Sequence, residues 1–290
     1  MSFKTALLGS LAAGAIFLGV GVNSASAAPV TFTWDPFGGG ISSPGSIFTA
    51  NNITVADYAV ISIPVNPTIP GSIVETGFLA TTAFGLQPPS VSMPGYVNGT
   101  GGGAPAAQPG ATPYQLFLSF TSTSHLNPVA PGIFAGAFDS VSYTLVGDIG
   151  GTCQFSPTGL SGCGATVNLE TGTLAAASTP TGTLQNTVSI VNGNPAASVL
   201  LSFNELVPGF FVSPPSFVTL QMESSFTNTP GVVTRSPANC PDSGLPCTIT
   251  IDGGGGNLSF IAVPEPSTIA LFGTGLLGLG WLARRRRVQS

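Results

Sequence analysis

Residues 114–121 read YQLFLSFT, and an apolar side chain returns there at every second position: Tyr114, Leu116, Leu118 and Phe120. A period of two with aromatic and β-branched residues is typical of a strand that buries one face. Three more stretches alternate in this way: 141–145, 199–204 and 218–223. Further strand candidates are 31–34, 47–55, 58–63, 73–83, 166–169, 188–191, 248–251 and 258–262. The sequence therefore predicts a body built almost entirely of strands.

Turn signals rich in glycine, proline and asparagine separate these strands. They include Asn127-Pro128, Pro131-Gly132, Asn192-Gly193 and a glycine-rich hairpin turn at 252–257. A Gly/Pro-rich stretch at 98–113 reads as a long loop within one domain, although a linker between two domains fits equally well. Many short strands joined by such turns are typical of a mainly β, antiparallel β-sandwich or jelly-roll-like fold. That is the fold we predict for the body.

The first 27 residues have the parts of a secretory signal peptide. Lys4 supplies the positive start, residues 6–22 are apolar, and Ala25 and Ala27 form a small-x-small cleavage site. We expect a signal helix that signal peptidase removes after Ala27. The exported body then begins at residue 28 and extends to residue 262.

The last 28 residues read VPEPSTIALFGTGLLGLGWLARRRRVQS. Two prolines, Pro264 and Pro266, bracket Glu265 and hold this segment extended. Residues 267–283 carry no charge and would form a helix of about 25 Å, the short end of a membrane span. Four consecutive arginines follow, Arg284, Arg285, Arg286 and Arg287. Because positive charge stays on the cytoplasmic side, we predict one C-terminal transmembrane helix with its C-terminus in the cytoplasm.

The order of these parts resembles the PEP-CTERM sorting signal of Gram-negative bacteria, over residues 263–288. In that family an exosortase, a membrane-embedded cysteine transpeptidase-like enzyme, cuts near the motif. It transfers the body to the cell surface or the exopolysaccharide layer. The resemblance implies an exosortase substrate that crosses the inner membrane transiently, with the catalytic residues on the exosortase. A permanent C-terminal anchor is the alternative.

The body also resembles the flocculation-associated PEP-CTERM proteins. The resemblance lies in residues 32–83, which contain FTANNITVADY and GFLATTAF, and in residues 198–229. Those proteins help cells to aggregate within exopolysaccharide. The resemblance implies a role in flocculation or biofilm.

The exported body is poor in charge and acidic. Ten acidic residues and one basic residue, Arg235, give it a formal charge of −9. It therefore has nothing with which to neutralise the phosphates of nucleic acid or of anionic lipid. Serine, threonine, asparagine and glycine must provide its surface, as they do in structural proteins of the cell exterior and in sugar-binding proteins.

Four cysteines lie in the exported body: Cys153, Cys163, Cys240 and Cys247. An even number in an exported protein argues for disulfides. Each neighbouring pair encloses a short loop with Gly and Pro, so of the three connectivities we favour 153–163 with 240–247. The sequence has no C-x-x-C motif and one histidine, which disfavours the rival zinc site.

No motif for catalysis, a metal or a cofactor stands out. His125 is the only histidine, no G-x-S-x-G elbow is present, and we expect His125 to lie in a solvated turn. Glu205 and Glu223 lie on predicted strands that would be neighbours in one topology, which leaves a polysaccharide-modifying enzyme as a remote alternative. We predict a non-enzymatic surface or matrix protein without metal or cofactor, with exopolysaccharide as a possible partner. A displayed, lectin-like module is the first alternative.

Overall fold

The computed structural model describes residues 31–34, 48–85, 90–91, 114–174, 186–202, 204–207, 209, 211–213, 220–241 and 246–262. The signal peptide with Ala25 and Ala27, the 98–113 stretch and the C-terminal tail lie outside these residues. Within the described ranges, no helix combines the length and the apolar character needed to cross a membrane. The two terminal helices therefore stay predictions.

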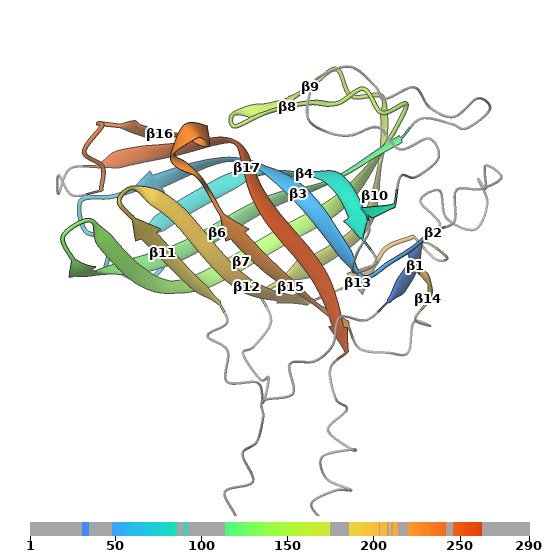
Figure 1. Ribbon diagram of the computed structural model, residues 1–290, viewed down its shortest axis with the longest axis horizontal. Coiled ribbons are helices and arrows are strands. Elements are labelled where there is room, and N and C mark those ends of the chain that lie inside the picture. Colours follow the sequence, from blue (N-terminus) through green and yellow to red (C-terminus); the bar gives the residue numbers. More distant parts are fainter. Residues whose placement is uncertain are drawn as a thin grey trace, which may run out of the picture.

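Eight antiparallel strands form a closed barrel (Figure 1). Their order around the wall is β11 (Thr187–Val191), β12 (Asn194–Ser202), β15 (Leu220–Thr227), β17 (Cys247–Ala262), β3 (Asn52–Ile63), β4 (Ile73–Gly85), β6 (Tyr114–Ala130) and β7 (Ile133–Ile149). β7 then pairs with β11, from Ile133 opposite Val191 to Ala137 opposite Thr187, which closes the wall. The predicted mainly β, antiparallel body is confirmed. The β-sandwich or jelly-roll is wrong, because one sheet closes on itself.

The length of β7 is the physical reason for closure. Its residues 133–137 pair with β11, while its residues 142–149 pair with β10 (Ala165–Thr173). The end of β10 also meets β12, through a bridge between Leu174 and Leu201. Both β11 and the end of β10 thus lie between β7 and β12, one at each end of the barrel. Alternation within single strands does not distinguish this arrangement from a sandwich.

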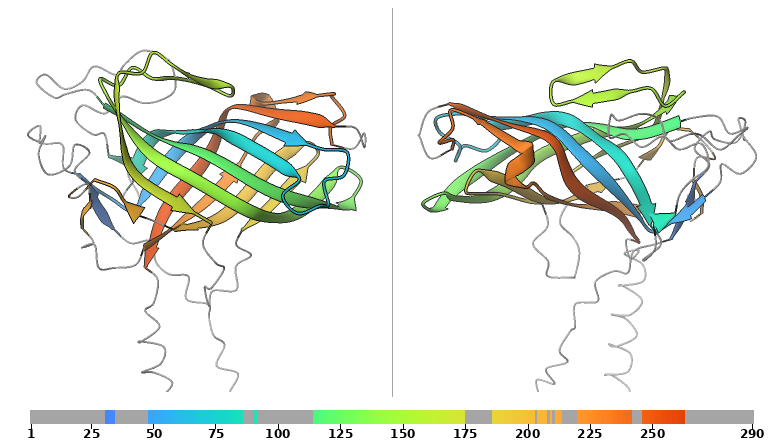
Figure 2. Two further views of the ribbon diagram at one scale, coloured as in Figure 1. Left: turned by 180° about the vertical axis from the view of Figure 1, so that it is seen from behind. Right: turned by 45° about the horizontal axis from the view of Figure 1, so that its top comes forward.

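Smaller elements lie around the barrel. A separate sheet contains β1 (Phe32–Trp34), β2 (Phe48–Ala50) and β14 (Phe211–Ser213), while β5 (Ser90–Val91) extends β4 and β13 (Asn204–Glu205) extends β10. At the other end, the short 3-10 helix η1 (Pro230–Val232) precedes β16 (Val233–Ser236), which pairs with β17. The hairpin of β8 (Gln154–Ser156) and β9 (Gly159–Ser161) lies over the outside of the barrel (Figure 2).

The barrel interior holds two apolar clusters. The cluster at the β10 end is built on residues such as Ile53, Val55, Leu79, Leu116, Leu145, Leu169 and Leu258. The cluster at the β16 end includes Ala59, Ile61, Ile73, Leu126, Ile249, Ile251, Cys240 and Cys247. Both predicted disulfides are present, Cys153–Cys163 and Cys240–Cys247, and the second lies within the β16-end cluster.

Two predicted turns are strand instead. Asn127-Pro128 lies inside β6, and the chain reverses at Pro131-Gly132. Residues 252–257 lie inside β17, which pairs with β3 from Cys247 to Ser259 with a bulge between Asp252 and Gly254. Gly253 allows that bulge, since it has φ +81°. The glycine-rich run is therefore strand and not a hairpin turn, because β3 pairs with β17 on both sides of the bulge.

Gly254 makes room for the side chain of Asn228. A Cβ on Gly254 would lie 1.8 Å from Asn228 Oδ1 and 2.8 Å from a methyl group of Ile251, whereas a Cβ on Gly255 would meet nothing within 4 Å. The two glycines are neighbours, and neither has a positive φ. They form a matched pair for a test of this contact.

We expect Gly254→Ala to lower the unfolding free energy by about 2–4 kcal/mol, because it overpacks the interior and displaces Asn228. Gly255→Ala should change it by less than about 0.5 kcal/mol, as an open surface site does. Urea denaturation of the mature protein measures both values. Equal effects of the two substitutions would contradict the proposed contact.

Candidate functional site

A polar layer crosses the barrel interior between the two apolar clusters. It consists of Asp57 on β3, Glu75 on β4, Ser122 on β6 and Asn228, which follows β15. Strand alternation places them there, since Asp57 continues the inward series of Val55 and Ala59. All four line an internal cavity of about 60 Å³ whose remaining wall is almost entirely apolar.

The hydrogen bonds of this layer are incomplete. Ser122 Oγ donates to Glu75 Oε2 over 3.1 Å, and Asn228 Nδ2 donates to Asp57 Oδ2 over 3.3 Å. Asp57 Oδ1 and Asn228 Oδ1 have no hydrogen-bond partner. Their side chains are buried, with Asp57 3% and Asn228 5% exposed. Unpaired acceptors at such depth cost folding free energy, about 1–3 kcal/mol each.

Burial dominates the acid–base behaviour of the two carboxyls. It raises the pKa of Asp57 to about 7, against a small opposing effect of the Asn228 hydrogen bond. Burial also raises the pKa of Glu75 to about 8, and the negative charge of Asp57 adds to this rise. Glu75 is half-buried by surface area, and we assign its accessible part to the cavity that it lines. Both groups therefore titrate near neutral pH.

A third acid lies deep in the wall beside this cavity. The hydroxyl of Tyr143 donates to Glu170 and lies 2.8 Å from the carbonyl oxygen of Ser202. Burial raises the pKa of Glu170 well above its usual range, and the charge of Glu205 adds to the rise. Tyr143 also lines the cavity, whereas Glu170 is not among the lining residues.

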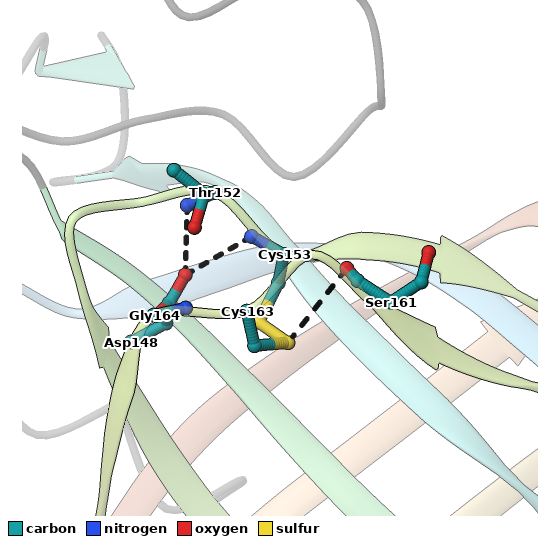
Figure 3. The surroundings of a disulfide bond; sticks show 6 residues. All are labelled: Asp148, Thr152, Cys153, Ser161, Cys163 and Gly164. Carbon is teal, nitrogen blue, oxygen red and sulfur yellow. Dashed lines mark hydrogen bonds between the residues drawn. A yellow bond between two sulfur atoms is a disulfide. The ribbon is translucent and has the colours of Figure 1, made fainter.

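A second feature lies on the outside, at the base of the β8–β9 hairpin (Figure 3). Asp148 is fully buried there and accepts three backbone N–H groups, from Thr152 (2.8 Å), Cys153 (3.0 Å) and Gly164 (2.8 Å). Cys163 completes the disulfide that joins the two legs of the hairpin. One carboxylate and one disulfide thus fix the hairpin at its base.

Aromatic contacts attach the hairpin to the barrel. The ring of Phe155 stacks on Tyr58 at 5.8 Å and meets Phe117 edge-on at 5.3 Å. A groove of about 400 Å³ remains beside this contact. It is lined by uncharged residues of the hairpin tip and of β3, β4 and β6, namely Val60, Thr76, Gly77, Phe78, Ser119, Phe120, Thr121, Pro157 and Thr158.

Hydroxyl side chains continue from the groove across the barrel wall in register. Thr76 stands opposite Thr121, which stands opposite Ser142 and then Thr173. In the next row, Ser119 stands opposite Thr144 and then Thr171. Neighbouring strands lie about 4.8 Å apart, so these rows form a regular, uncharged outer face. We call it the hydroxyl face.

Several predicted site residues lie elsewhere than expected. His125 is inside β6, and its Nδ1 lies 3.0 Å from both carboxylate oxygens of Asp139, so the solvated turn histidine is wrong. Glu205 on β13 pairs with Glu170, whereas Glu223 on β15 pairs with Leu200 and Ser259. The two glutamates are therefore not neighbours, and the structure does not bring them together as a catalytic pair.

Sequence reasoning missed Asp57 and Glu75. The signal was present, because each acid occupies an inward position within an otherwise apolar series. Among the described residues, no group of three or more His, Cys, Asp or Glu side chains comes together as a metal site. The residues predicted for sorting and the membrane stop, 264–266 and 284–287, lie outside the described part of the chain.

The two raised pKa values predict that stability falls as pH rises. The folded carboxyls hold their protons more tightly than the unfolded ones, whose pKa values are 3.8 and 4.5. Their contribution is complete below about pH 4 and is lost as pH passes about 7 and 8. In EDTA, the melting temperature of the mature protein should therefore drop between pH 5 and pH 9. A variant with both Asp57→Asn and Glu75→Gln should lose most of that dependence.

Asp252→Asn is the control for this measurement, because Asp252 is exposed on β17. It should keep the slope of the wild-type protein. The same slope in the double variant as in the wild type would show that the interior acids do not set the pH dependence.

One comparison with known proteins gave a match, and it lies in the tail. The family model of the PEP-CTERM protein-sorting motif matches residues 262–287. Curated proteins gave no match to the chain, and neither did solved structures. The motif implies export, processing by an exosortase and sorting to the cell surface. The sorting signal predicted from the tail is confirmed, and the chain carries a PEP-CTERM protein-sorting motif.

Proposed function

We propose that this chain is a non-enzymatic surface protein whose barrel is displayed by exosortase sorting and supports aggregation within exopolysaccharide, as in flocculation or biofilm. The observation that carries the proposal is the position of the sorting motif. Its match begins at Ala262, which is the last residue of β17. The tail therefore follows the barrel wall directly.

This junction suits a body that is released or transferred whole. All eight strands of the barrel precede the Pro264–Pro266 motif, so a cut near the motif removes no strand. β17 pairs with β15 on one side and β3 on the other, and it stays paired after such a cut. The barrel is then the part that remains outside the cell.

The interior also supports a role without catalysis. Its cavity of about 60 Å³ is well below the roughly 300–1,000 Å³ of typical ligand pockets, so a polysaccharide chain does not fit beside Asp57 and Glu75. The predicted alternative pair, Glu205 and Glu223, lies on strands that do not neighbour one another. Both facts favour a surface or matrix protein over a polysaccharide-modifying enzyme.

The sorting step can be tested at Glu265. We expect Glu265→Ala to accumulate in the inner-membrane fraction with Arg284–Arg287 intact, because the exosortase no longer reads the motif. Cells with this variant should aggregate less. Ser267→Ala, two residues away, is the control and should match the wild type in fractionation and in aggregation.

Cell fractionation followed by mass spectrometry of the C-terminal peptide provides both readouts. Intact arginines in wild-type cells, or identical fractionation of the Glu265→Ala protein, would contradict exosortase processing. If the wild-type protein is processed normally but deletion of its gene leaves cell aggregation unchanged, the proposed role in aggregation is rejected.

A displayed carbohydrate-binding module is the second candidate, favoured by the groove beside the hydroxyl face. Its volume of about 400 Å³ lies in the range of ligand pockets. Its lining combines hydroxyl groups with Phe78, Val60 and Pro157 and contains no charge. Such a surface suits a neutral sugar, which presents both hydroxyls and apolar ring faces.

Thr121→Lys tests this candidate, because it places a long charged side chain in the groove. We expect at least a fivefold loss of binding to purified exopolysaccharide, measured by pull-down of the mature protein. Thr234→Lys on β16, an exposed strand position remote from the groove, should bind as the wild type does. No binding by the wild-type protein, or equal binding by both variants, would reject the module.

A further inference from the structure

The interior carboxyls have no positively charged side chain to pair with. The exported body contains one arginine, one histidine and no lysine. Arg235 is exposed, and its Nη1 donates to the carbonyl oxygen of Asn192 in the β11–β12 turn. His125 is paired with Asp139 outside the cavity. Any neutralising charge at Asp57 and Glu75 must therefore come from solvent, as protons or as a cation.

The polar layer has hydrogen-bond acceptors without partners on residues that line the cavity. Asp57 Oδ1 and Asn228 Oδ1 are both without a partner and more than nine-tenths buried, and both residues line the cavity. Glu75 lines the same cavity, and Ser122 Oγ holds its Oε2. A buried charge without a partner is costly, so proteins pair it, protonate it or coordinate a metal.

The volume of the cavity limits which ligands can bind there. One water needs about 10–15 Å³ by this measure, and a dry cavity of about 150 Å³ holds benzene. At about 60 Å³, the cavity has room for an ion with a few waters but not for a sugar or an aromatic ring. The donor set is all oxygen, from two carboxyls and one amide, which suits Ca²⁺ or Mg²⁺ rather than a transition metal.

We propose that the barrel interior binds one divalent cation, held by Asp57, Glu75 and Asn228, with water completing its coordination. Two carboxylates and one divalent ion leave the interior neutral. Ser122 is a positioning residue that orients Glu75. Among the residues that line the cavity, the remaining titratable group is Tyr143, and its hydroxyl contacts Glu170. This site is independent of sorting and of the outer groove.

Protons compete with the cation for the same oxygens. A carboxyl must lose its proton before it binds a cation, so the affinity for the cation falls as the pH falls. Binding should therefore be weak at pH 6 and strong at pH 9. This dependence separates the interior site from an exposed carboxylate pair, which is fully ionised at both values.

Mature protein treated with EDTA provides the test. At pH 9, saturating CaCl₂ should raise the melting temperature by about 5–10 °C, and at pH 6 by much less. Equilibrium dialysis against ⁴⁵Ca²⁺ at pH 9 should give one ion per chain. MgCl₂ and KCl at matched ionic strength identify the preferred ion and the effect of salt alone.

Two variants locate the ion. Asp57→Asn and Glu75→Gln should each weaken Ca²⁺ binding at least tenfold, while exposed Asp252→Asn should leave it unchanged. Both cavity variants should melt no lower than wild type in EDTA at pH 9, which shows that they fold. Equal melting with Ca²⁺ and EDTA and no bound ⁴⁵Ca²⁺ at pH 9 would overturn the proposal in favour of protons alone. Unaltered binding by Asp57→Asn would place the ion elsewhere.

Discussion

The pairing of β7 with β11 is the contact on which the rest of the structure depends. An open sheet of these strands would expose both faces, and the inward series on each strand would meet solvent. Once β7 meets β11, every second residue of eight strands faces one enclosed interior. Closure therefore creates the two apolar clusters. It also buries the polar side chains at inward-facing positions of the same strands, and these include Asp57 and Glu75.

The interior consequently joins two opposing demands. The apolar clusters at the β10 and β16 ends supply the burial that stabilises the barrel. The layer between them contains acids whose charged forms the same burial disfavours. Gly254 shows that this layer is built with little slack, since its missing side chain is the space that Asn228 occupies. A glycine-rich run that looks like a turn is thus part of the polar layer.

The sequence predicted the features that depend on neighbouring residues, such as strands, turns and short disulfide loops. It did not predict the features that depend on contacts between distant segments. Alternation at 114–121 found a real strand, Asn192-Gly193 is a turn, and the cysteine pairs follow from short Gly/Pro loops. The barrel was missed because closure joins residues 133–137 to 187–191, and no local pattern encodes that pairing. The groove was missed for a similar reason, since it needs Pro157 of the hairpin to lie over Thr76 and Thr121. The inward positions of Asp57 and Glu75 could have been predicted from strand alternation. For Asp57, this requires joining the predicted strands 47–55 and 58–63 into one.

Scarcity of positive charge links the inside of the barrel to its outside. Outside, the groove has no charged side chain in its lining and so nothing with which to neutralise the phosphates of nucleic acid or of anionic lipid. Inside, the same scarcity removes the usual solution for a buried acid, which is a neighbouring lysine or arginine. Asp148 shows the other solution available to this chain, since three backbone N–H groups satisfy its carboxylate. Asp57 lacks such donors, because the backbone around it is already committed to pairing with β4 and β17. The scarcity of lysine and arginine therefore means that protons or cations from solvent must neutralise the interior acids.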